Sequence, residues 1–530
     1  MPTDTVPYRT TGYFSKLICD YLDRETGLDQ FYHRFPLESE FGAQLEEKSQ
    51  FSKEKRSVLV DRLNSQYSGL SVSEATQANI DSLSNENTFT ITTGHQLNLF
   101  TGPLYFLYKI FSVINLSERL KESYPNYHFV PIFWMASEDH DFDEINYFNI
   151  HGKKLRWNRE SGGAVGDMDT QGLEYVHDLF QKEVGSHEFA EKVTDLFRET
   201  YVKHKTLSEA TRFLGNELFK EYGLVIVDGD DAELKKQFAP YVEMELRERK
   251  SYEIVKETSA KLKSLGYREQ VSPREINLFY LSDGLRERII EQEGLFHVNN
   301  TQQSYSLDEI LSELEEHPER FSPNALLRPL YQEVILPNLC YIGGGGELAY
   351  WMQLKAYFDA VQVPFPILLL RNSALLVRDK QLQKLEKLNA TIEELFLPTL
   401  ELENVHTQRL SEIDIDFSAQ RNFLKEQFAA LYEVAKDTDG SFVGAVAAQE
   451  KKQLNGLDRL EKRLLKAQRR KLNDQLQRLT DLQEELFPGG HLQERENNFS
   501  EFYLEDGPGL LQKIKKELDP FVNKLSVIKL

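Results

Sequence analysis

Cysteine is scarce in this 530-residue chain, which has only Cys19 and Cys340. Two cysteines build neither a disulfide framework nor a cysteine-rich metal cluster, and such usage is typical of a reduced cytoplasm. Long apolar runs are absent too, since none approaches the roughly 18 residues that a membrane span needs. The first residues, MPTDTVPYRTTGYF, lack the basic segment and apolar core of a signal peptide. We therefore expect a cytoplasmic protein without a membrane partner.

Positive charge is in deficit, with 63 lysines and arginines against 85 aspartates and glutamates and a formal net charge of -22. A surface of this sign repels phosphate backbones and anionic lipids, so the composition argues against a nucleic-acid-binding protein. It leaves room for a local basic pocket that binds a phosphate or a carboxylate. Hydrophobic residues make up 40% of the chain, enough for packed cores, and the length predicts several structural units.

Short apolar segments alternate with helix-like patterns through residues 1–378. Several of them are almost continuously apolar, as in strands that helices cover on both faces. The alternation predicts an α/β fold with a Rossmann-like, doubly wound parallel sheet. Two long, charged, helix-rich stretches, about residues 151–221 and 231–322, are interpreted as insertions that build walls around the carboxyl edge of the sheet. The predicted strands are residues 88–93, 129–135, 223–227, 276–281, 334–342 and 365–370.

The pattern changes after residue 378, where leucines recur at heptad-like spacing among charged residues. Seven residues separate successive members of the clearest run, which is Leu465, Leu472, Leu479 and Leu486. A narrow apolar seam flanked by charge predicts an antiparallel helical coiled-coil arm over residues 379–487. The alternative is a solvated bundle helix that packs only on its own chain. A Phe-Pro-Gly-Gly breaker follows, and the aromatic residues of 488–530 predict a C-terminal segment that docks on the core.

The most informative segment is TFTITTGHQLNLFTGPLYFLYK, residues 88–109. It predicts a β-branched strand, a Gly-His-Gln turn and an amphipathic helix. A strand that feeds a helix in this way leaves backbone N–H groups free at its carboxyl end, where α/β proteins bind anions and phosphates. We therefore expect His95 and Gln96 to be catalytic. Substrate-binding roles at the same turn are expected for Gly94, Asn98, Thr101 and Gly102.

A second candidate, FWMASEDHDFDE, is a strand that runs into clustered acids and one histidine. Carboxylates at the end of a strand bind an amine, orient a base or hold a divalent cation. The alternative is an acidic first helical turn with Ser137 as its N-cap, which explains the acids but not the histidine among them. Neighbouring turn residues rarely converge on a zinc ion, so no metal ligand is assigned and metal dependence stays open. We expect Ser137 to bind substrate and assign catalytic roles to Glu138, Asp139, His140 and Asp141.

The third candidate, CYIGGGGELAYW, ends a strand in four glycines before a helix that begins near Glu347. Four consecutive glycines allow a ligand to approach the backbone closely, whereas the alternative, a tight turn that needs glycine for packing, requires fewer. The segment matches neither a P-loop nor a dinucleotide fingerprint. Weaker candidates are the acids of VIVDGDD and the side chains of Arg328 and Arg371. We expect the glycine segment to bind substrate through Gly343, Gly344, Gly345, Gly346, Glu347 and Tyr350.

Five long motifs carry a family resemblance, in this order: TGHQLNLFTGPLYFLYK, FWMASEDHDFDEIN, GLVIVDGDD, LRPLYQEVILP with IGGGGELAYWMQLK, and FPGGHLQERENNF. Over essentially its whole length the chain resembles the cysteine ligases of bacillithiol biosynthesis, the BshC family. The resemblance implies a Rossmann core like that of class I nucleotidyltransferases, with two insertions and a dimerising coiled coil. It also implies that L-cysteine is joined to glucosaminyl-malate as the last step of the pathway.

The same resemblance implies an adenine nucleotide, ATP or ADP, with Arg495, Asn497 and Asn498 as its contacts. It further implies a homodimer that forms through the coiled coil. Gly94 and His95 match the position of the HxGH-type signature of the nucleotidyltransferase superfamily. Two departures stand out, since the turn reads GHQLN without the second histidine and no clear lysine-rich KMSKS-type loop follows.

The leading hypothesis is therefore a nucleotide-dependent C–N ligase that activates the cysteine carboxylate as an acyl-adenylate or an acyl-phosphate. In this hypothesis His95 and Gln96 donate hydrogen bonds to a phosphate or to the transition state. Residues 138–141 bind or deprotonate the attacking amine, and the glycine segment lines the acceptor site. Two alternatives stay open: a nucleotidyltransferase that acts on another sugar or acid, and a non-catalytic coiled-coil scaffold on a degenerate Rossmann body.

Overall fold

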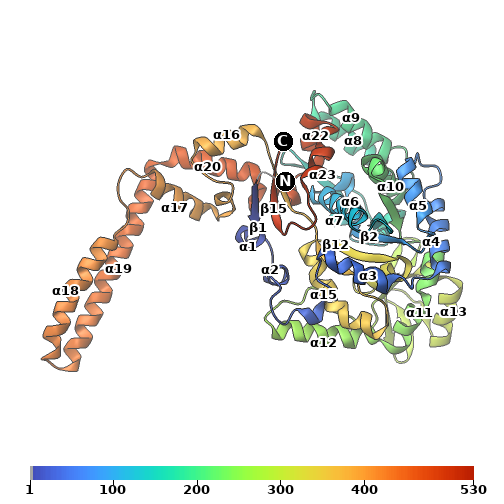
Figure 1. Ribbon diagram of the computed structural model, residues 1–530, viewed down its shortest axis with the longest axis horizontal. Coiled ribbons are helices and arrows are strands. Elements are labelled where there is room, and N and C mark those ends of the chain that lie inside the picture. Colours follow the sequence, from blue (N-terminus) through green and yellow to red (C-terminus); the bar gives the residue numbers. More distant parts are fainter. Residues whose placement is uncertain (1–3) are drawn as a thin grey trace. The chain divides into compact units, whose positions relative to one another are not determined.

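A computed structural model describes residues 4–530, which divide into two compact units. The first unit contains the residues up to Leu376 together with Leu492–Leu530, and the second is Val377–His491. The second unit is thus inserted into the first in the sequence, and the C-terminal residues pack with the Rossmann-like part. Figure 1 shows the elements of both units. Among the residues described, no helix combines the length and the apolar character that crossing a membrane requires.

A five-stranded, all-parallel sheet forms the centre of the first unit (Figure 1). Its strand order is β13-β12-β2-β3-β6, so the order reverses between the first strand in the chain, β2, and the fourth, β12. This is the 3-2-1-4-5 order of a Rossmann fold, and the fold class predicted from the sequence is confirmed. The strands are β2 (Thr88–His95), β3 (His128–Met135), β6 (Val225–Asp228), β12 (Asn338–Gly343) and β13 (Ile367–Leu370).

Helices cover both faces of the sheet, which explains why its strands are almost continuously apolar. On one face Ile91 and Ile342 pack with Val113 of α6 (Tyr105–Ser123). On the other face the Tyr341 ring stacks on Trp351 of α15 (Gly345–Ala360), with ring centroids 4.5 Å apart. Adjacent residues of a strand point to opposite faces, so β12 holds one helix on each side.

A buried polar network joins β12 to β2 near the start of β12. The Glu333 carboxylate accepts a hydrogen bond from Asn338 Nδ2 at 2.6 Å and pairs with Lys48 Nζ at 2.9 Å. The Asn338 amide oxygen in turn accepts from the Thr92 hydroxyl at 2.8 Å. Lys48 and Glu333 are almost fully buried. These bonds fix the register of the two strands at which the sheet reverses.

The strand predicted at residues 276–281 exists as β7 (Leu278–Ser282), but its place in the parallel sheet was wrong. It belongs to a separate antiparallel sheet of order β10-β9-β8-β7-β11. Two-residue turns, Asp283-Gly284 and Glu293-Gly294, join β7 to β8 and β8 to β9, and both glycines have positive φ. Short turns of this kind connect antiparallel neighbours. The second insertion is therefore less purely helical than predicted.

The predicted strand at residues 334–342 was too long. Its first two residues end α14 (Arg328–Ile335), and β12 begins only after Pro337. A continuous apolar run does not distinguish a buried helix from a buried strand, and proline separates the two here. The second insertion and its flank contain α11 (Ala232–Glu248), α12 (Lys250–Ser264), β8 (Leu285–Gln292), β9 (Leu295–Val298), β10 (Ser304–Tyr305), α13 (Leu307–Glu316) and β11 (Phe321–Pro323).

The remaining elements of the first unit come from the first insertion and from both ends of the chain. The insertion and the segment just before it contain one short helix, a short hairpin and three longer helices. These are α7 (Phe142–Ile145), β4 (Tyr147–Ile150), β5 (Lys153–Arg156), α8 (Leu173–Val184), α9 (Ala190–Tyr201) and α10 (Leu207–Phe219). Strands from the two ends share a small sheet of order β1-β15-β14. The terminal elements are β1 (Asp4–Pro7), α1 (Tyr8–Thr11), α2 (Lys16–Leu22), α3 (Phe41–Lys48), α4 (Lys53–Gln66), α5 (Glu74–Ser82), β14 (Ala374–Val377), α21 (Gln493–Glu496), α22 (Phe499–Asp506), α23 (Gly509–Glu517) and β15 (Lys524–Lys529).

The second unit is entirely helical, and its longest helices form a hairpin. Phe428 and Ala435 of one hairpin helix pack with Val446 of the other. The seven-residue leucine spacing crosses a helix boundary at Leu472, which ends the second hairpin helix. The leucine run therefore does not form one continuous seam. The helices are α16 (Asp379–Lys387), α17 (Thr399–Leu410), α18 (Ser418–Lys436), α19 (Gly440–Lys471) and α20 (Asn473–Leu486).

Replacement of Lys48 by Met should lower the free energy of unfolding of the first unit by about 3–5 kcal/mol, because Glu333 would keep a buried charge without its partner. Urea denaturation followed by tryptophan fluorescence measures this, since all three tryptophans lie in the first unit. The double variant Lys48→Met/Glu333→Gln should recover about half of the loss. A single variant as stable as the parent protein would contradict the role given to the network.

Candidate active site

A cavity of about 930 Å³ opens at the carboxyl ends of β2, β3 and β12. Because the strand order reverses between β2 and β12, this is the switch point at which open α/β sheets bind ligands. The three motifs singled out in the sequence all reach it, and the second insertion supplies facing residues. The predicted residues that line the cavity are Gly94, His95, Gln96, Glu138, Asp139, His140, Asp141, Gly344, Gly345, Gly346, Glu347, Tyr350 and Arg495.

Glu347 anchors the glycine turn at the start of α15. Its carboxylate accepts hydrogen bonds from the Tyr341 hydroxyl at 2.6 Å and the Gly344 N–H at 2.8 Å, and it pairs with Lys109 Nζ at 2.6 Å. Burial alone would raise the pKa of Glu347, but Lys109 and these donors hold it below its ordinary value. The carboxylate is therefore ionised and engaged with protein atoms, so its contribution to the cavity is the shape of the turn.

Gly343 does not face the cavity. It is the last residue of β12, and its carbonyl accepts the backbone N–H of Arg371 at 2.9 Å. A Cβ at this position would come within 2.9 Å of the Tyr341 ring, so glycine is required here by packing. The packing alternative holds for this glycine, whereas Gly344, Gly345 and Gly346 line the cavity.

His95 is the last residue of β2 and is only 7% exposed. Its ring contacts Tyr105 and Phe106, and its Nε2 has no hydrogen-bond partner among residues 4–530. Burial lowers the pKa of His95 well below its ordinary value, and the nearby cations Lys109 and Arg371 lower it further. The imidazole is therefore neutral at physiological pH. It offers a ligand one polar ring nitrogen but no positive charge.

Gln96 does not have the free donors that the sequence analysis gave it. Its Nε2 donates to the Asp139 carboxylate and to the Glu144 carboxylate, both at 2.9 Å. Both amide hydrogens are thus engaged, because carboxylates beside the amide accept them. Asp139 is engaged as well, since its other oxygen accepts the backbone N–H of His140 at 2.7 Å. This pair holds the turn after β2 against the acidic loop after β3.

Two arginines, of which Arg371 is buried and Arg328 is partly buried, supply positive charge on the β12 side of the cavity. Arg328 Nη2 and Arg371 Nε have no hydrogen-bond partner among the described residues. Arg371 Nη2 donates to Glu494 at 2.8 Å, which ties this arginine to the C-terminal segment. Together with the N-terminus of α15 at Gly344, two guanidinium groups that line the cavity fit a carboxylate or a phosphate.

Lys109 was missed in the sequence analysis, although it interrupts the apolar pattern of the helix after the Gly-His-Gln turn. It is 3% exposed, and its ammonium group donates to the Gly94 carbonyl at 2.7 Å besides pairing with Glu347. A lysine in the middle of a buried helical face is the signal that identifies it. The facing residues of the second insertion carried no such signal: Gln270, Arg274, Arg286 and Arg288.

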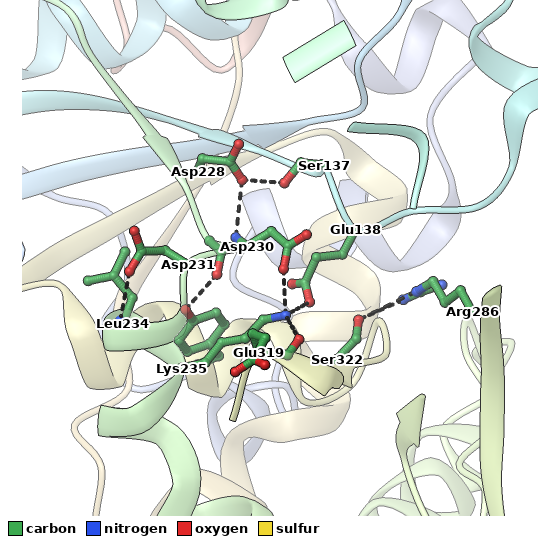
Figure 2. A network of polar contacts seen from close by, with 12 residues as sticks. Ser137, Glu138, Asp228, Asp230, Asp231, Leu234, Lys235, Arg286, Glu319 and Ser322 are labelled. Carbon is green, nitrogen blue, oxygen red and sulfur yellow. Dashed lines mark hydrogen bonds and ion pairs between the residues drawn. The ribbon is translucent and has the colours of Figure 1, made fainter. Parts of the chain in front are cut away.

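The acidic loop after β3 divides into two faces (Figure 2). Ser137 is buried and donates to Asp228, so it does not reach the cavity. Glu138 lines the cavity, and its Oε1 pairs with Lys235 Nζ at 2.8 Å. The substrate contact predicted for Ser137 is therefore replaced by a structural bond between β3 and β6.

His140 is held by an arginine of the second insertion. Arg286 Nη1 lies 2.7 Å from His140 Nδ1. Because a guanidinium group only donates, Nδ1 must accept, which places the proton of the neutral imidazole on Nε2. The His140 side chain is 46% exposed, so Nε2–H is the hydrogen-bonding group of this residue that is open to a ligand.

A second cavity of about 380 Å³ adjoins the first and shares Gln96, Tyr105 and Arg495 with it. Of the predicted residues, Asn98 and Gly102 line only this second cavity. Thr101 lines neither cavity and has positive φ. The turn after β2 therefore separates two neighbouring spaces.

Two of the three predicted nucleotide contacts, Asn497 and Asn498, form hydrogen bonds within the protein. Asn498 is fully buried, donates to the carbonyls of Phe100 and Gly102 at 2.7 and 2.6 Å, and caps α22 by accepting the Ser500 N–H. Asn497 Nδ2 donates to Glu501 at 2.9 Å. Neither lines a cavity, so Arg495 alone of the three is placed to meet a ligand.

Replacement of Asn498 by Ala should lower the free energy of unfolding by about 2–4 kcal/mol, because two buried carbonyls lose their donor and α22 loses its cap. Affinity of the folded protein for ATP, measured by calorimetry, should not change. The matched control Asn497→Ala removes one partly buried bond and should cost about 0.5–1 kcal/mol. A stable Asn498→Ala variant that no longer binds ATP would show that Asn498 contacts the nucleotide.

Comparisons with known proteins agree with this architecture. A family model described as "Bacillithiol biosynthesis BshC, N-terminal Rossmann-like domain" matches residues 1–372, and one described as "Bacillithiol biosynthesis BshC, C-terminal coiled-coil domain" matches residues 374–530. Three relatives carry the name "Putative cysteine ligase BshC". The relative from Christiangramia forsetii is 57% identical over 100% of this chain and 99% of its own. Those from Flavobacterium johnsoniae and Cytophaga hutchinsonii are 56% and 41% identical, over 100% and 96% of this chain and 100% and 95% of their own. The chain therefore belongs to the BshC family of bacillithiol biosynthesis.

Proposed function

We propose that the protein is a nucleotide-dependent ligase that joins L-cysteine to glucosaminyl-malate through an amide bond. The observation that carries the proposal is the division of charge within one cavity. The guanidinium groups of Arg328 and Arg371 line the β12 side, and the Glu138 carboxylate lines the β3 side. An amide-forming ligase needs both, because it binds an anionic acyl group and deprotonates an amine. The names of the relatives support the ligase activity.

In this proposal the anionic group of the reaction lies at Arg328 and Arg371. The cysteine carboxylate, or the phosphate that activates it, would lie against Arg328, Arg371 and the N-terminus of α15. Neutral His95 has its unpartnered Nε2 next to this position. As a hydrogen-bond donor in a water-poor site, it would stabilise the oxyanion that forms when the acyl carbon is attacked.

The amine side of the reaction belongs at Glu138. The amine of glucosaminyl-malate must be neutral to attack, so a base has to accept its proton. In the attack the new C–N bond forms, the bond from the acyl carbon to the phosphate oxygen breaks, and the amine proton passes to Glu138. ATP supplies the leaving group, as AMP with an acyl-adenylate or as phosphate with an acyl-phosphate.

An adenine nucleotide is proposed to lie where the two cavities meet. Arg495 and Tyr105 line both cavities, and the Arg495 guanidinium group lies 6.0 Å from the centre of the Tyr105 ring. An aromatic face beside an arginine suits a base and a phosphate of one ligand. In this proposal the nucleotide phosphates would lie toward the arginines and the α15 N-terminus.

Replacement of His95 by Ala should lower kcat for ligation by about 100- to 1000-fold, as removal of an oxyanion donor does. The assay incubates purified protein with cysteine, glucosaminyl-malate and ATP and measures bacillithiol by thiol labelling. His187→Ala, which removes an exposed histidine, is the control and should keep the parent rate. Normal product formation by His95→Ala would refute the assigned role. Consumption of ATP without need for cysteine would favour a nucleotidyltransferase, and no turnover by the parent would favour a scaffold.

The helical unit is proposed to join two copies of the chain. Helix α18 packs on α19 through Phe428 and Ala435. It also carries three exposed apolar side chains, Phe423, Leu431 and Val434, which are 62, 45 and 60% exposed. Phe423 lines a hollow beside Leu457 and Leu460 of α19. The spacing of the three exposed side chains, eight and then three residues, places them on one side of the helix. A second copy of the same hairpin is the occupant that fits, because two identical faces form a closed, self-complementary pair.

The double variant Phe423→Glu/Val434→Glu should convert the dimer into a monomer, because charges replace two apolar contacts in each partner. Light scattering coupled to size-exclusion chromatography measures the mass. The control is Leu400→Glu, an equally exposed apolar residue on α17, and it should leave the mass unchanged. A parent protein that is monomeric at micromolar concentration would overturn the proposed dimer.

A further inference from the structure

Lys235 is a buried lysine whose ammonium group is fully engaged (Figure 2). It pairs with Glu138 Oε1 at 2.8 Å and with Asp230 at 2.6 Å, and it donates to the Glu319 carbonyl at 2.7 Å. Two of the three ammonium hydrogens are donated, to Asp230 and to the Glu319 carbonyl, and the contact with Glu138 Oε1 is an ion pair. These three oxygens hold the ammonium group in place.

The start of α11 aims Lys235 at Glu138. Asp231 caps this helix by accepting the N–H groups of Glu233 and Leu234, and the Lys235 N–H donates to the Asp231 carbonyl. Lys235 therefore lies in the first turn, directly above the loop that follows β6. Two acids of VIVDGDD, Asp230 and Asp231, which were weaker candidates in the sequence, thus support this lysine.

We propose that Lys235 is a positioning residue of the reaction, which fixes the Glu138 carboxylate on the cavity wall with Oε2 open to the substrate amine. The proposal rests on the proposed function in one respect, namely that Glu138 accepts the amine proton. Within residues 4–530 the Glu138 carboxylate forms its ion pair through Oε1, so Oε2 is the oxygen left for a ligand. In this arrangement one carboxylate oxygen of Glu138 binds Lys235, and the other is available to accept the amine proton.

The groups around Glu138 explain why a cation is needed there. Burial and Asp230 raise the pKa of Glu138, whereas Lys235 and Arg286 of β8 lower it. Burial is the largest effect, and the net result is a raised pKa. Tyr331 of α14 also lies near these acids, and its own pKa is raised by burial and by them. A carboxyl group with a raised pKa is a stronger base. Without Lys235, burial and Asp230 would keep it protonated and unable to accept a proton.

Two substitutions that remove charges of opposite sign beside Glu138 test the proposal. Lys235→Met removes the lowering effect of the lysine, so the acid limb of the pH profile of kcat/KM should move to higher pH by about one to three units. Asp230→Asn removes a carboxylate that raises the pKa of Glu138, so the acid limb should move to lower pH. If the network were purely structural, both variants would lose activity because both break the same contacts. The acid limb of their pH profiles would then stay where it is in the parent protein.

Two further variants keep the test decisive if Lys235→Met folds poorly. Lys235→Met/Asp230→Asn removes one charge of each sign and should place the acid limb between those of the single variants. Lys235→Arg keeps the charge and should keep the limb near its parent position. Lys261→Met, which breaks an exposed pair with Glu257 on α12, is the matched control and should behave as the parent protein.

A measurement without substrate separates this proposal from the proposed function. Carbon-13 NMR of protein labelled at the glutamate carboxyl carbon, with Glu138→Gln to assign the signal, follows the titration of Glu138 directly. The midpoint should rise in Lys235→Met and fall in Asp230→Asn even if no ligation is detected. Midpoints that do not move in either variant would overturn the role of Lys235. Midpoints that move while the parent forms no amide would overturn only the ligase assignment.

Discussion

The reversal of strand order between β2 and β12 is the constraint on which the rest of the structure depends. Two parallel strands that lead their helices to opposite faces leave a gap at their carboxyl ends. Here the gap receives the Gly-His-Gln turn from one strand and the glycine turn from the other. The buried bonds of Glu333 and Asn338 hold the strands in register, and Glu347 with Lys109 connects the turns above them. A shift of either strand would separate His95 from the arginines.

The cavity gathers positive charge although the molecule as a whole is acidic. The chain carries a net charge of -22, yet Lys109, Arg328 and Arg371 are gathered at one end of a single sheet. Lys109 and Arg371 are buried and Arg328 is partly buried. Each is partly paired with protein acceptors, which offsets the cost of removing it from water. An anionic substrate would be repelled by the acidic surface of the protein and attracted by the cations inside the cavity. Binding would therefore depend on entry into the cavity rather than on long-range attraction.

Much of the fold could be predicted because strands buried on both faces have an apolar signature that survives in a single sequence. The strand ends were equally visible, since glycine and clustered polar residues mark them. The antiparallel sheet of the second insertion was missed, although Asp283-Gly284 and Glu293-Gly294 are hairpin signals. The roles of Gln96, Ser137 and Asn498 could not be predicted, because they depend on partners 43, 91 and nearly 400 residues away. Local patterns identify polar residues at a strand end, but only the fold shows which of them face the ligand.

The contact between Arg371 and Glu494 joins two segments that the whole second unit separates in the sequence. Glu494 is 1% exposed, and it accepts from the Ser373 hydroxyl and the Ala374 N–H as well as from Arg371. During synthesis Arg371 leaves the ribosome more than a hundred residues before its partner. An incomplete chain therefore has the strands and the turns, and an Arg371 that Asn372 and Ser373 contact but Glu494 does not yet hold. The order of translation thus makes the contact between Arg371 and Glu494 one of the last features of this cavity to form, after the helical unit has emerged.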